Sequence, residues 1–378
     1  MKIAIDISQI VYEGTGIASY TDQLVRNLLS VDRENEYILF GISGRKYQVL
    51  SKYFTEIKKT YKNAECKFLP IPQTIGKVLW NRLHIIDLDK IIGKVDIFHS
   101  SDWIQPPIAA KKITTIHDLV IYKYPEISHP EIVATQKRRL YWVKKECDQI
   151  LSDSFATKKD IVNILHISTE RIAVVYPGIE EIYKNQNEEE IIRIRQKYRI
   201  GNDYILFVGT NEPRKNLHRV ISAYKLFLKH PLINALRRPI ELVLVGKYGW
   251  GRQLKLTNSV HSLDYVDKKD LPAIYSGAIF FIYPSLYEGF GLPVIEAMAC
   301  GTPVITSNRG SLKEVAGSAS LLVDPEMEDD IAVKMTKIMV DKELRTELIK
   351  RGKEQVEKFN WGKAAREIKD IYEKVAKQ

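Results

Sequence analysis

Short apolar runs alternate along the chain with longer stretches in which apolar residues recur at helical spacing. In the first half, runs typical of buried parallel strands lie at 2–7, 36–40, 95–99, 113–116, 150–154 and 172–176. In the second half, such runs lie at 204–209, 240–246, 278–283, 304–306 and 321–323. Amphipathic helices are predicted between and after these strands, at 17–28, 217–228 and 363–377. This alternation predicts an α/β protein with parallel sheets.

A break near the middle of the chain marks a domain boundary. Pro177 and Gly178 end the last strand of the first half, and a strongly charged segment, 184–199, follows them. A length of 378 residues is enough for two domains, each with its own core. We therefore expect a first domain at 1–178 and a second at 179–360.

Charge and cysteine content narrow the classes of protein that the chain fits. The net charge of +10 is spread over both halves, which disfavours a nucleic-acid-binding tail and suits phosphate-bearing ligands or an anionic membrane. Cys66, Cys147 and Cys300 have no metal-ligand spacing, so a reducing, cytoplasmic location is expected. Neither a signal peptide nor a run of about 18 apolar residues is seen. Any membrane contact is therefore expected to be peripheral, at the inner face of the cell membrane.

The stretch from Pro284 to Pro303 has features that suit an anionic or hydroxylated ligand. It follows the apolar run 278–283, and its glycines predict a tight loop before a helix that ends near Cys300. Unpaired amides at such a helix start suit an anion or hydroxyl groups. Glu288 and Glu296 flank the loop, and a carboxylate can accept two hydrogen bonds from vicinal hydroxyls. Taken alone, the same residues also fit a structural turn with a surface Glu and a Glu that interacts with the helix dipole.

Two cations stand at another predicted helix start. Arg214 and Lys215 precede the helix 217–228, for which Asn216 is the expected N-cap. The helix dipole disfavours positive charge at this position by roughly 0.3–1 kcal/mol. We therefore expect these side chains to meet an anion, and charge-assisted hydrogen bonds to a phosphate contribute about 1.5–3 kcal/mol each.

The first half has candidate residues near the carboxyl ends of its strands, where ligands of open α/β sheets lie. Gly14 and Gly16 precede a predicted helix, but Ser19 stands where a dinucleotide fingerprint needs its third glycine. A structural turn and a ligand-binding loop both fit these glycines. His99 and His117 each follow a strand, and a histidine at such a position is most often a satisfied structural residue.

Basic and aromatic residues mix in three stretches that are predicted to be helical, 52–62, 77–92 and 137–145. The first two could rest on lipid head groups and the third could bind an acceptor phosphate, but all three also fit solvated helix faces. Asp87 and Asp89 have the spacing of a metal-binding dyad, which we interpret as a solvated helix end. The sequence therefore predicts no metal site.

Three motifs together resemble one enzyme family. Seven residues separate Glu288 from Glu296 in PSLYEGFGLPVIEAMACGTP, Gly209 begins a Gly-x-x-x-Pro-Arg-Lys-Asn pattern, and His117 lies in TIHDL. Over nearly the full chain, this combination resembles the family-4 retaining glycosyltransferases. The resemblance implies the GT-B fold, which is α/β with two facing Rossmann-like domains. It also implies that the C-terminal helix, 361–378, crosses back to complete the first domain.

The resemblance implies roles for individual residues. Catalytic roles fall to four residues, His117, Arg214, Lys215 and Glu288. The histidine would face the donor sugar, the two cations would bind the donor diphosphate, and Glu288 would hold sugar hydroxyls. Glu296 would bind the ribose diol, and Val266 lies in the segment that meets the base. Backbone groups of the remaining positions would contact diphosphate or sugar: Gly14, Gly16, Gly209, Phe290, Gly291 and Leu292.

The activity that the resemblance implies is transfer of a hexose from a nucleotide sugar, with retention of configuration, by front-face departure and attack, and without a metal or other cofactor. The motif strings favour mannose from GDP-mannose as donor and a glycan or lipid-linked saccharide as acceptor, with a UDP-hexose as the alternative donor. Three other classes stay open: a nucleotide-sugar 2-epimerase on the same fold, an NAD-dependent dehydrogenase and a carbohydrate-binding subunit without turnover. No nucleic-acid partner is expected.

Overall fold

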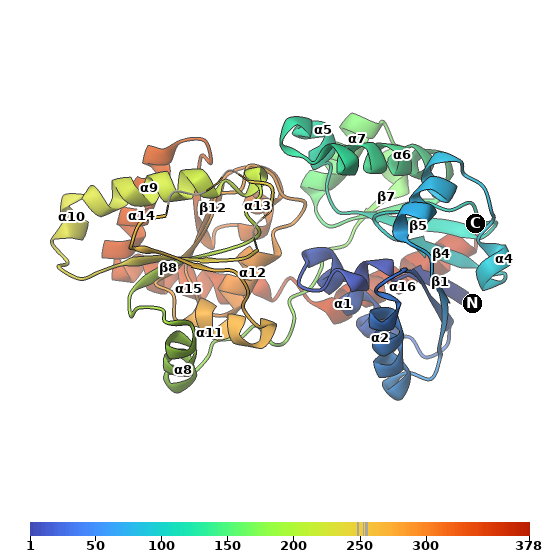
Figure 1. Ribbon diagram of the computed structural model, residues 1–378, viewed down its shortest axis with the longest axis horizontal. Coiled ribbons are helices and arrows are strands. Elements are labelled where there is room, and N and C mark those ends of the chain that lie inside the picture. Colours follow the sequence, from blue (N-terminus) through green and yellow to red (C-terminus); the bar gives the residue numbers. More distant parts are fainter. Residues whose placement is uncertain (248, 252, 254–255) are drawn as a thin grey trace. The chain divides into compact units, whose positions relative to one another are not determined.

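The computed structural model describes residues 1–247, 249–251, 253 and 256–378. The chain forms two compact units: unit 1 comprises Met1–Gly178 and Asn360–Gln378, and unit 2 comprises Ile179–Phe359 (Figure 1). Each unit has one parallel sheet with helices on both sides. The expected α/β class with two Rossmann-like, parallel-sheet domains is confirmed.

The sheet of unit 1 has seven parallel strands in the order β3-β2-β1-β4-β5-β6-β7. They are β1 (Lys2–Asp6), β2 (Glu36–Ile42), β3 (Ala64–Leu69), β4 (Ile97–Ser100), β5 (Lys111–Ile116), β6 (Gln149–Ser152) and β7 (Ile172–Val174). All except β3 match an apolar run in the sequence. In β3, at the edge of the sheet, Glu65 and Lys67 are exposed and interrupt the apolar pattern.

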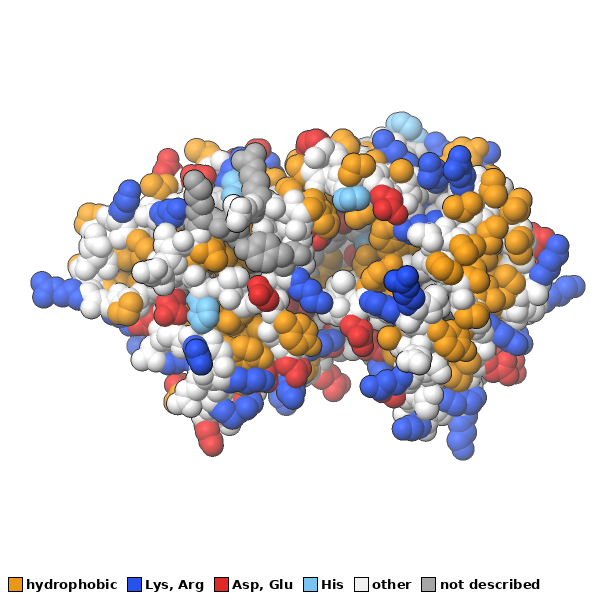
Figure 2. Space-filling model, viewed as in Figure 1, with side chains coloured by type: hydrophobic (Ala, Val, Ile, Leu, Met, Phe, Trp, Pro, Cys, Tyr) orange, Lys and Arg blue, Asp and Glu red, His pale blue; other side chains and the backbone are white. Residues whose placement is uncertain are grey.

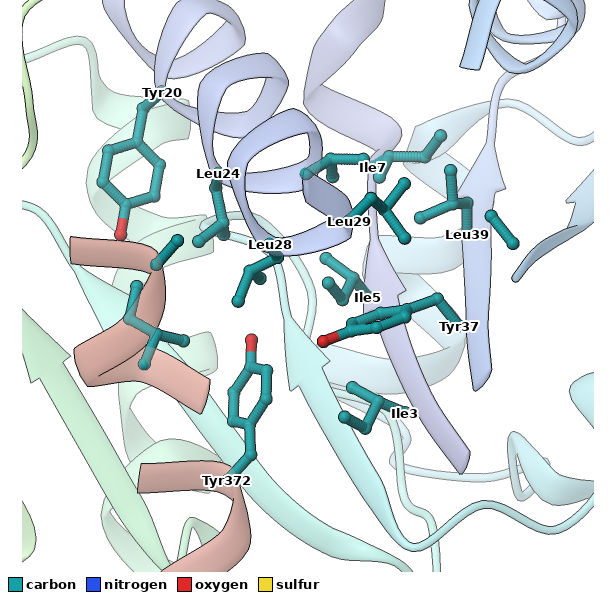
Figure 3. Packing of buried hydrophobic residues seen from close by; sticks show 14 of the residues in the cluster. Ile3, Ile5, Ile7, Tyr20, Leu24, Leu28, Leu29, Tyr37, Leu39 and Tyr372 are labelled. Carbon is teal, nitrogen blue, oxygen red and sulfur yellow. The ribbon is translucent and has the colours of Figure 1, made fainter. Parts of the chain in front are cut away.

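The C-terminal helix belongs to the core of unit 1. Helix α16 (Trp361–Ala376) packs beside α1 (Gly16–Val31), and both lay apolar side chains on β1 and β2 (Figure 3). Tyr372 of α16 is fully buried, and its hydroxyl group lies 2.7 Å from His99 Nδ1. The other longer helices of unit 1 are α2 (Tyr47–Thr60), α6 (Pro130–Glu146) and α7 (Phe155–Leu165).

The basic and aromatic face expected on α2 is divided in the structure. Tyr53 is buried, and Phe54 and Tyr61 pack against the core, whereas the lysines of the same stretch are exposed. The expectation that these aromatic rings contact lipid is therefore wrong, because they already pack against the core. Of the described residues, none belongs to a helix that is both long and apolar enough to cross a bilayer.

The stretch 77–92 does not form the single helix that its spacing predicts. It contains a π-helical turn, η2 (Lys77–Arg82), which continues the short α3 (Gln73–Gly76), and then α4 (Asp89–Ile92). Between η2 and α4, His84 and Ile86 have φ angles of 53° and 66°, which an α-helix cannot contain. The chain therefore turns twice here instead of continuing as a helix.

The sheet of unit 2 has six parallel strands in the order β10-β9-β8-β11-β12-β13. They are β8 (Tyr204–Val208), β9 (Glu241–Val245), β10 (Val260–Leu263), β11 (Phe280–Tyr283), β12 (Val304–Ser307) and β13 (Ser320–Val323). The main helices are α8 (Glu188–Tyr198), α9 (Leu217–Lys229), α11 (Leu271–Ser276), α12 (Leu292–Ala299), α13 (Gly310–Ala316), α14 (Glu328–Val340) and α15 (Lys342–Val356).

In each unit the strand order reverses beside the first strand, between β1 and β4 in unit 1 and between β8 and β11 in unit 2. Ligands of open parallel sheets bind at this switch point, beyond the carboxyl ends of the strands. Arg214 and Lys215 follow β8, and Glu288 follows β11. The topology thus brings the three charged residues to one place in unit 2.

Candidate functional site

A buried carboxylate joins the two loops at the switch point of unit 2. Glu288 Oε2 accepts a hydrogen bond from Arg214 Nη1 at 2.5 Å, and Oε1 accepts one from Lys215 Nζ at 2.7 Å. Oε1 also accepts bonds from the hydroxyl groups of Ser285 at 2.7 Å and Tyr283 at 3.0 Å. Because Glu288 is only 8% exposed, its charge is balanced by these protein groups rather than by water.

The charges of this cluster keep Glu288 ionised. Burial raises the pKa of Glu288, but Arg214 and Lys215 outweigh burial and lower the pKa to about 2. Burial and the charge of Arg214 lower the pKa of Lys215, and Glu288 opposes that change. Glu212 supplies a second carboxylate, which accepts a hydrogen bond from Arg214 Nε at 2.9 Å. The two cations therefore already have protein anions beside them, and a bound phosphate would share them with Glu288.

Hydrogen bonds hold the two loops together. The carbonyl oxygen of Arg214 accepts a bond from the Leu286 amide at 2.8 Å. The Ser285 hydroxyl group lies 2.8 Å from the same carbonyl and shares its one hydrogen between this oxygen and Glu288 Oε1. Asn216 precedes α9, but its φ is 63° and its side chain makes no cap bond. Its Nδ2 group donates to the carbonyl of Pro284 at 3.0 Å instead. Asn216 therefore occupies the expected N-cap position, but its side chain does not cap the helix, because it ties the loop after β8 to the loop after β11.

Gly209 follows β8 in close contact with Gly246, which follows β9. The Gly209 amide donates to the carbonyl of Val245 at 2.8 Å. A Cβ atom on Gly246, whose φ is 147°, would lie 2.2 Å from the carbonyl oxygen of Gly209. The path of the loop that carries the two cations thus depends on a contact that only glycine permits.

The start of α12 presents backbone groups rather than side chains. Gly291 has a φ of 104°, and a Cβ atom there would lie 2.5 Å from Leu312 Cδ2. Leu292 is the first residue of the helix, so its amide has no partner within the helix. Phe290 is 5% exposed and packs edge-on against Phe359. A ligand at this turn would therefore meet the amides of these residues.

Glu296 lies in a separate environment on α12. Tyr275 donates to its Oε2 at 2.9 Å, and Tyr183 also bonds to the carboxylate. Burial raises the pKa of Glu296 to about 7; the Tyr275 hydrogen bond opposes this shift, and the charge of Glu180 adds to it. The two carboxylates of the motif thus differ, since one is firmly ionised and the other titrates near neutral pH.

Val266 lies beyond β10, which is the edge strand of unit 2. Its side chain is buried, and the amide of the next residue, Asp267, donates to the Tyr198 hydroxyl group at 3.3 Å. A contact between Val266 and the nucleotide base would therefore use backbone groups.

In unit 1, His117 forms an ion pair with Asp153. His117 Nδ1 lies 2.6 Å from Asp153 Oδ2. Burial lowers the pKa of His117, but Asp153 outweighs burial and raises it to about 9, so the ring is positively charged at neutral pH. His99 instead contacts the hydroxyl groups of Tyr372 and Thr115 at 2.7 and 3.0 Å, and burial lowers its pKa to about 3. His99 is therefore a structural residue.

A small pocket lies beside His117 at the switch point of unit 1. Its lining includes Asp6, Gln9, Asp102 and Tyr20. The Tyr20 ring packs edge-on against His117, with 4.6 Å between ring centres. Hydroxyl, carboxylate and amide groups in one concave site suit a ligand rich in hydroxyls.

Gly14 and Gly16 form the exposed turn before α1. Gly14 has a φ of 79°, and a Cβ atom there would meet nothing within 4 Å. Gly16 is the first residue of α1, and the Thr15 hydroxyl group caps the helix by accepting from the Ala18 amide at 3.3 Å. Backbone amides at this turn are placed at the positive end of a helix of 16 residues.

Sequence reasoning missed the partners of the charged residues: Tyr283, Ser285, Glu212, Asp153 and Tyr275. Tyr283 ends an apolar run and has the pattern of an ordinary core residue. Asp153 directly follows a strand, at the edge where ligands bind, and this position was a usable signal.

Comparison with known proteins covers both units. The description "Glycosyltransferase Family 4" fits residues 14–181, and "Glycosyl transferases group 1" fits residues 189–355. O-antigen chain mannosyltransferase B of Escherichia coli is 31% identical over 376 residues, which cover 96% of each chain. Among solved structures, HepE of Anabaena in complex with UDP and glucose has a TM-score of 0.71 at 16% identity, over 99% of this chain and all (100%) of that one. WaaG, a glycosyltransferase involved in lipopolysaccharide biosynthesis, has a TM-score of 0.67 at 13% identity, over 98% and 99%.

These matches agree with the two parallel sheets, and they define a glycosyltransferase with the GT-B fold. An NAD-dependent dehydrogenase is thereby excluded. The O-antigen chain mannosyltransferase, which is similar over almost the whole length, identifies the family more closely. The chain belongs to glycosyltransferase family 4, and it resembles the mannosyltransferases of that family.

Proposed function

We propose that the protein transfers mannose from GDP-mannose to a glycan or lipid-linked saccharide, with retention of configuration and without a metal ion. The observation that carries this proposal is the buried cluster of Arg214, Lys215 and Glu288 at the switch point of unit 2. Mannose as the transferred sugar is supported by the name of the O-antigen chain mannosyltransferase, which is similar to this chain over nearly its full length.

The two cations suit the departing diphosphate. Negative charge grows on the leaving group in the transition state, and fixed donors stabilise it most when they need no rearrangement. Lys215 has three N–H groups, and among the described residues Tyr283 and Glu288 take two of them. The third is available to a phosphate oxygen. The guanidinium of Arg214 is held by Glu212 and Glu288, so its orientation is set before a ligand arrives.

Glu288 is suited to hold the donor sugar and unsuited to attack it. Its pKa is about 2, and its Oε1 atom accepts hydrogen bonds from three protein groups, which makes the carboxylate a weak nucleophile. Its Oε2 atom accepts from Arg214 and can accept a further bond from a sugar hydroxyl. Retention through a covalent intermediate needs a carboxylate that attacks the anomeric carbon. We therefore favour front-face substitution. The bond from the anomeric carbon to phosphate oxygen breaks, the acceptor oxygen bonds to that carbon on the same face, and its proton passes to the departing phosphate.

The remaining candidates keep supporting roles in this proposal. Glu296 binds the ribose diol, the amides at Phe290, Gly291 and Leu292 meet sugar or phosphate, and Val266 lies near the base. The positively charged ring of His117 is suited to donate a hydrogen bond to a sugar oxygen. Backbone amides at Gly14, Gly16 and Gly209 approach the diphosphate.

Two alternatives stay open under the same fold. A UDP-hexose donor is favoured by the UDP and glucose in the HepE complex, although that likeness is one of fold. A nucleotide-sugar 2-epimerase would release nucleoside diphosphate without any acceptor.

A donor panel tests the proposal. GDP, UDP and ADP are compared by thermal shift, and release of nucleoside diphosphate from each sugar nucleotide is measured with and without acceptor. We expect GDP to stabilise the protein most, and GDP-mannose to be consumed only with acceptor. Arg214→Ala and Glu288→Gln should lower turnover by roughly 10²–10³, the loss typical of one fixed transition-state contact.

Arg238→Ala is the matched control, because Arg238 forms an exposed ion pair with Asp203 in the same unit. A larger shift with UDP would contradict the donor assignment. Wild-type turnover by Arg214→Ala would contradict the site.

A further inference from the structure

An apolar segment of unit 1 faces solvent without a covering element. Between β3 and α4, five aliphatic side chains are each about half exposed: Ile75 (44%), Val78 (45%), Leu83 (54%), Ile85 (48%) and Ile86 (45%). We call this the 75–86 segment. A soluble protein rarely exposes so many large aliphatic residues together unless they contact a partner.

The inner side of the 75–86 segment is firmly anchored. Trp80 is 1% exposed, and its Nε1 group donates to the carbonyl of Ile86 at 3.1 Å. Asn81 Nδ2 donates to the carbonyl of Trp103 at 2.7 Å, and Asn81 Oδ1 accepts from the Gln105 amide at 2.9 Å. The outward aliphatic side chains are therefore presented by a fixed support, not by a loose loop.

Two residues of the segment, His84 and Ile86, have a left-handed backbone conformation. Ile86 has a φ of 66°, which is rare for a β-branched residue and costs of the order of a tenfold to hundredfold change in population. His84, with a φ of 53°, stacks on Trp142 with 3.6 Å between ring centres and pairs with Glu146. Strain that the surroundings maintain is typical of a functional surface.

Positive charge borders the segment. Helix α6 packs against η2, where Trp142 donates to the carbonyl of Asn81 at 2.9 Å. The exposed residues of α6 include four cations and a half-exposed tyrosine: Lys137, Arg138, Lys144, Lys145 and Tyr141. Figure 2 shows hydrophobic side chains gathered on this domain, with Lys and Arg side chains around them.

The acidic groups near the segment lie beside cations or backbone amides, and Glu131, at the start of α6, lies 3.9 Å from Lys77. Asp89 accepts from the Ala109 amide, and Asp87 lies 4.0 Å from Lys90. Glu146 pairs with His84 and Lys112. The surface therefore has a mainly apolar and basic character.

We propose that the 75–86 segment inserts into the interfacial layer of an anionic membrane, with the exposed cations of α6 against the lipid head groups. Aliphatic side chains bordered by Lys, Arg and Tyr are the composition that binds such an interface. Each cation near an anionic surface strengthens binding by about fivefold. This places membrane contact on a surface other than α2, and it requires no particular donor or reaction.

Vesicle sedimentation with the full chain tests the proposal. Vesicles of phosphatidylcholine with phosphatidylglycerol are compared with vesicles of phosphatidylcholine alone. Wild type should bind the anionic vesicles, and Leu83→Ser with Ile85→Ser should lower the partition coefficient more than tenfold. Arg138→Ala combined with Lys144→Ala should also lower the partition coefficient, by a larger factor at low salt than at high salt. The exposed Leu226 and Leu232 of unit 2, changed to Ser, provide the matched control and should leave binding unchanged.

Nucleotide binding of every variant is measured by thermal shift, so that failure of the donor site and failure of the membrane surface are distinguished. Equal binding by the Leu83→Ser, Ile85→Ser variant and wild type would overturn the proposal. So would absence of wild-type binding to anionic vesicles. A concentration-dependent dimer that forms without lipid and is lost in this variant would assign the segment to a second copy instead, and would also overturn it.

Discussion

At the residue scale, Glu288 and Glu296 show how one side-chain type acquires two different states. Both belong to the motif that sequence reasoning singled out, but the motif does not reveal their partners. Glu288 is ionised because two cations reach it from a loop that is distant in sequence. Glu296 is surrounded by tyrosines and a second carboxylate, which could not be foreseen from spacing within the motif.

The raised pKa of Glu296 predicts a pH dependence of donor binding. Its pKa is about 7, above the ordinary 4.5, so the group is mostly protonated below neutral pH and ionises as pH rises. If the carboxylate accepts the ribose hydroxyls, the affinity for a sugar nucleotide should rise about tenfold from about pH 6 to about pH 8. The same shift lowers the free energy of unfolding as pH rises from about 4.5 to about 7, between the ordinary pKa and the raised one. Calorimetric titration measures the affinity.

A sugar nucleotide is the right probe, because its diphosphate diester keeps the same charge over this range. Glu296→Gln should bind weakly and with no pH dependence. A donor analogue that lacks the ribose diol should behave in the same way with the wild-type protein. A pH profile that Glu296→Gln leaves unchanged would assign the titration to another group.

At the element scale, strands were predicted more successfully than the connections between them. Buried parallel strands are continuous apolar runs, and two strands at sheet edges, β3 and β10, were not predicted as strands. The prediction of a single helix at 77–92 was wrong for a different reason: its apolar residues have helical spacing, but several of them face solvent. Spacing cannot tell a face that packs on the core from one that is presented outward.

The contact between Gly209 and Gly246 predicts a coupled loss of stability and nucleotide affinity. In Gly246→Ala the Cβ atom would lie 2.2 Å from a backbone oxygen, which cannot move without shifting the loop of Arg214 and Lys215. We expect the free energy of unfolding to fall by more than about 1 kcal/mol, as measured by urea unfolding. Nucleotide affinity should fall as well.

The variant Gly93→Ala is the control for Gly246→Ala, because it introduces backbone strain without a steric clash. Gly93 has a φ of 82°, and its Cβ would meet nothing within 4 Å, so only the conformational cost remains. This variant should keep full nucleotide affinity. Equal losses of stability and affinity in both variants would show that the glycine contact does not position the loop.

At the scale of the whole molecule, the sequence predicted the class of fold and placed Arg214, Lys215 and Glu288 in loops that follow two predicted strands, and the structure supplied the strand order. The carboxyl ends of β8 and β11 are neighbours because the order of the sheet reverses there. The placement of Arg214, Lys215 and Glu288 could therefore be expected, whereas the tyrosine and serine that complete the cluster come from tertiary packing.

Transfer without a metal ion predicts that chelation leaves activity unchanged. Arg214 and Lys215 supply positive charge where the diphosphate is proposed to depart. In the part of the chain that the structure describes, no group of three or more His, Cys, Asp or Glu is arranged to hold an ion. Initial rates are compared before and after treatment with EDTA. Loss of the rate with recovery on addition of Mg²⁺ or Mn²⁺ would contradict the proposed mechanism.

The position of α16 determines the order in which the two units can be completed during synthesis. Unit 2 is inserted in sequence within unit 1, because the chain leaves unit 1 at Gly178 and re-enters it at Asn360. Unit 2 is complete in sequence before the ribosome reaches α16, whereas the core around Tyr372 must wait until α16 has been synthesised. Ribosome stalling or a frameshift between the codons of unit 2 and those of α16 would thus leave the second unit intact and the first one unfinished.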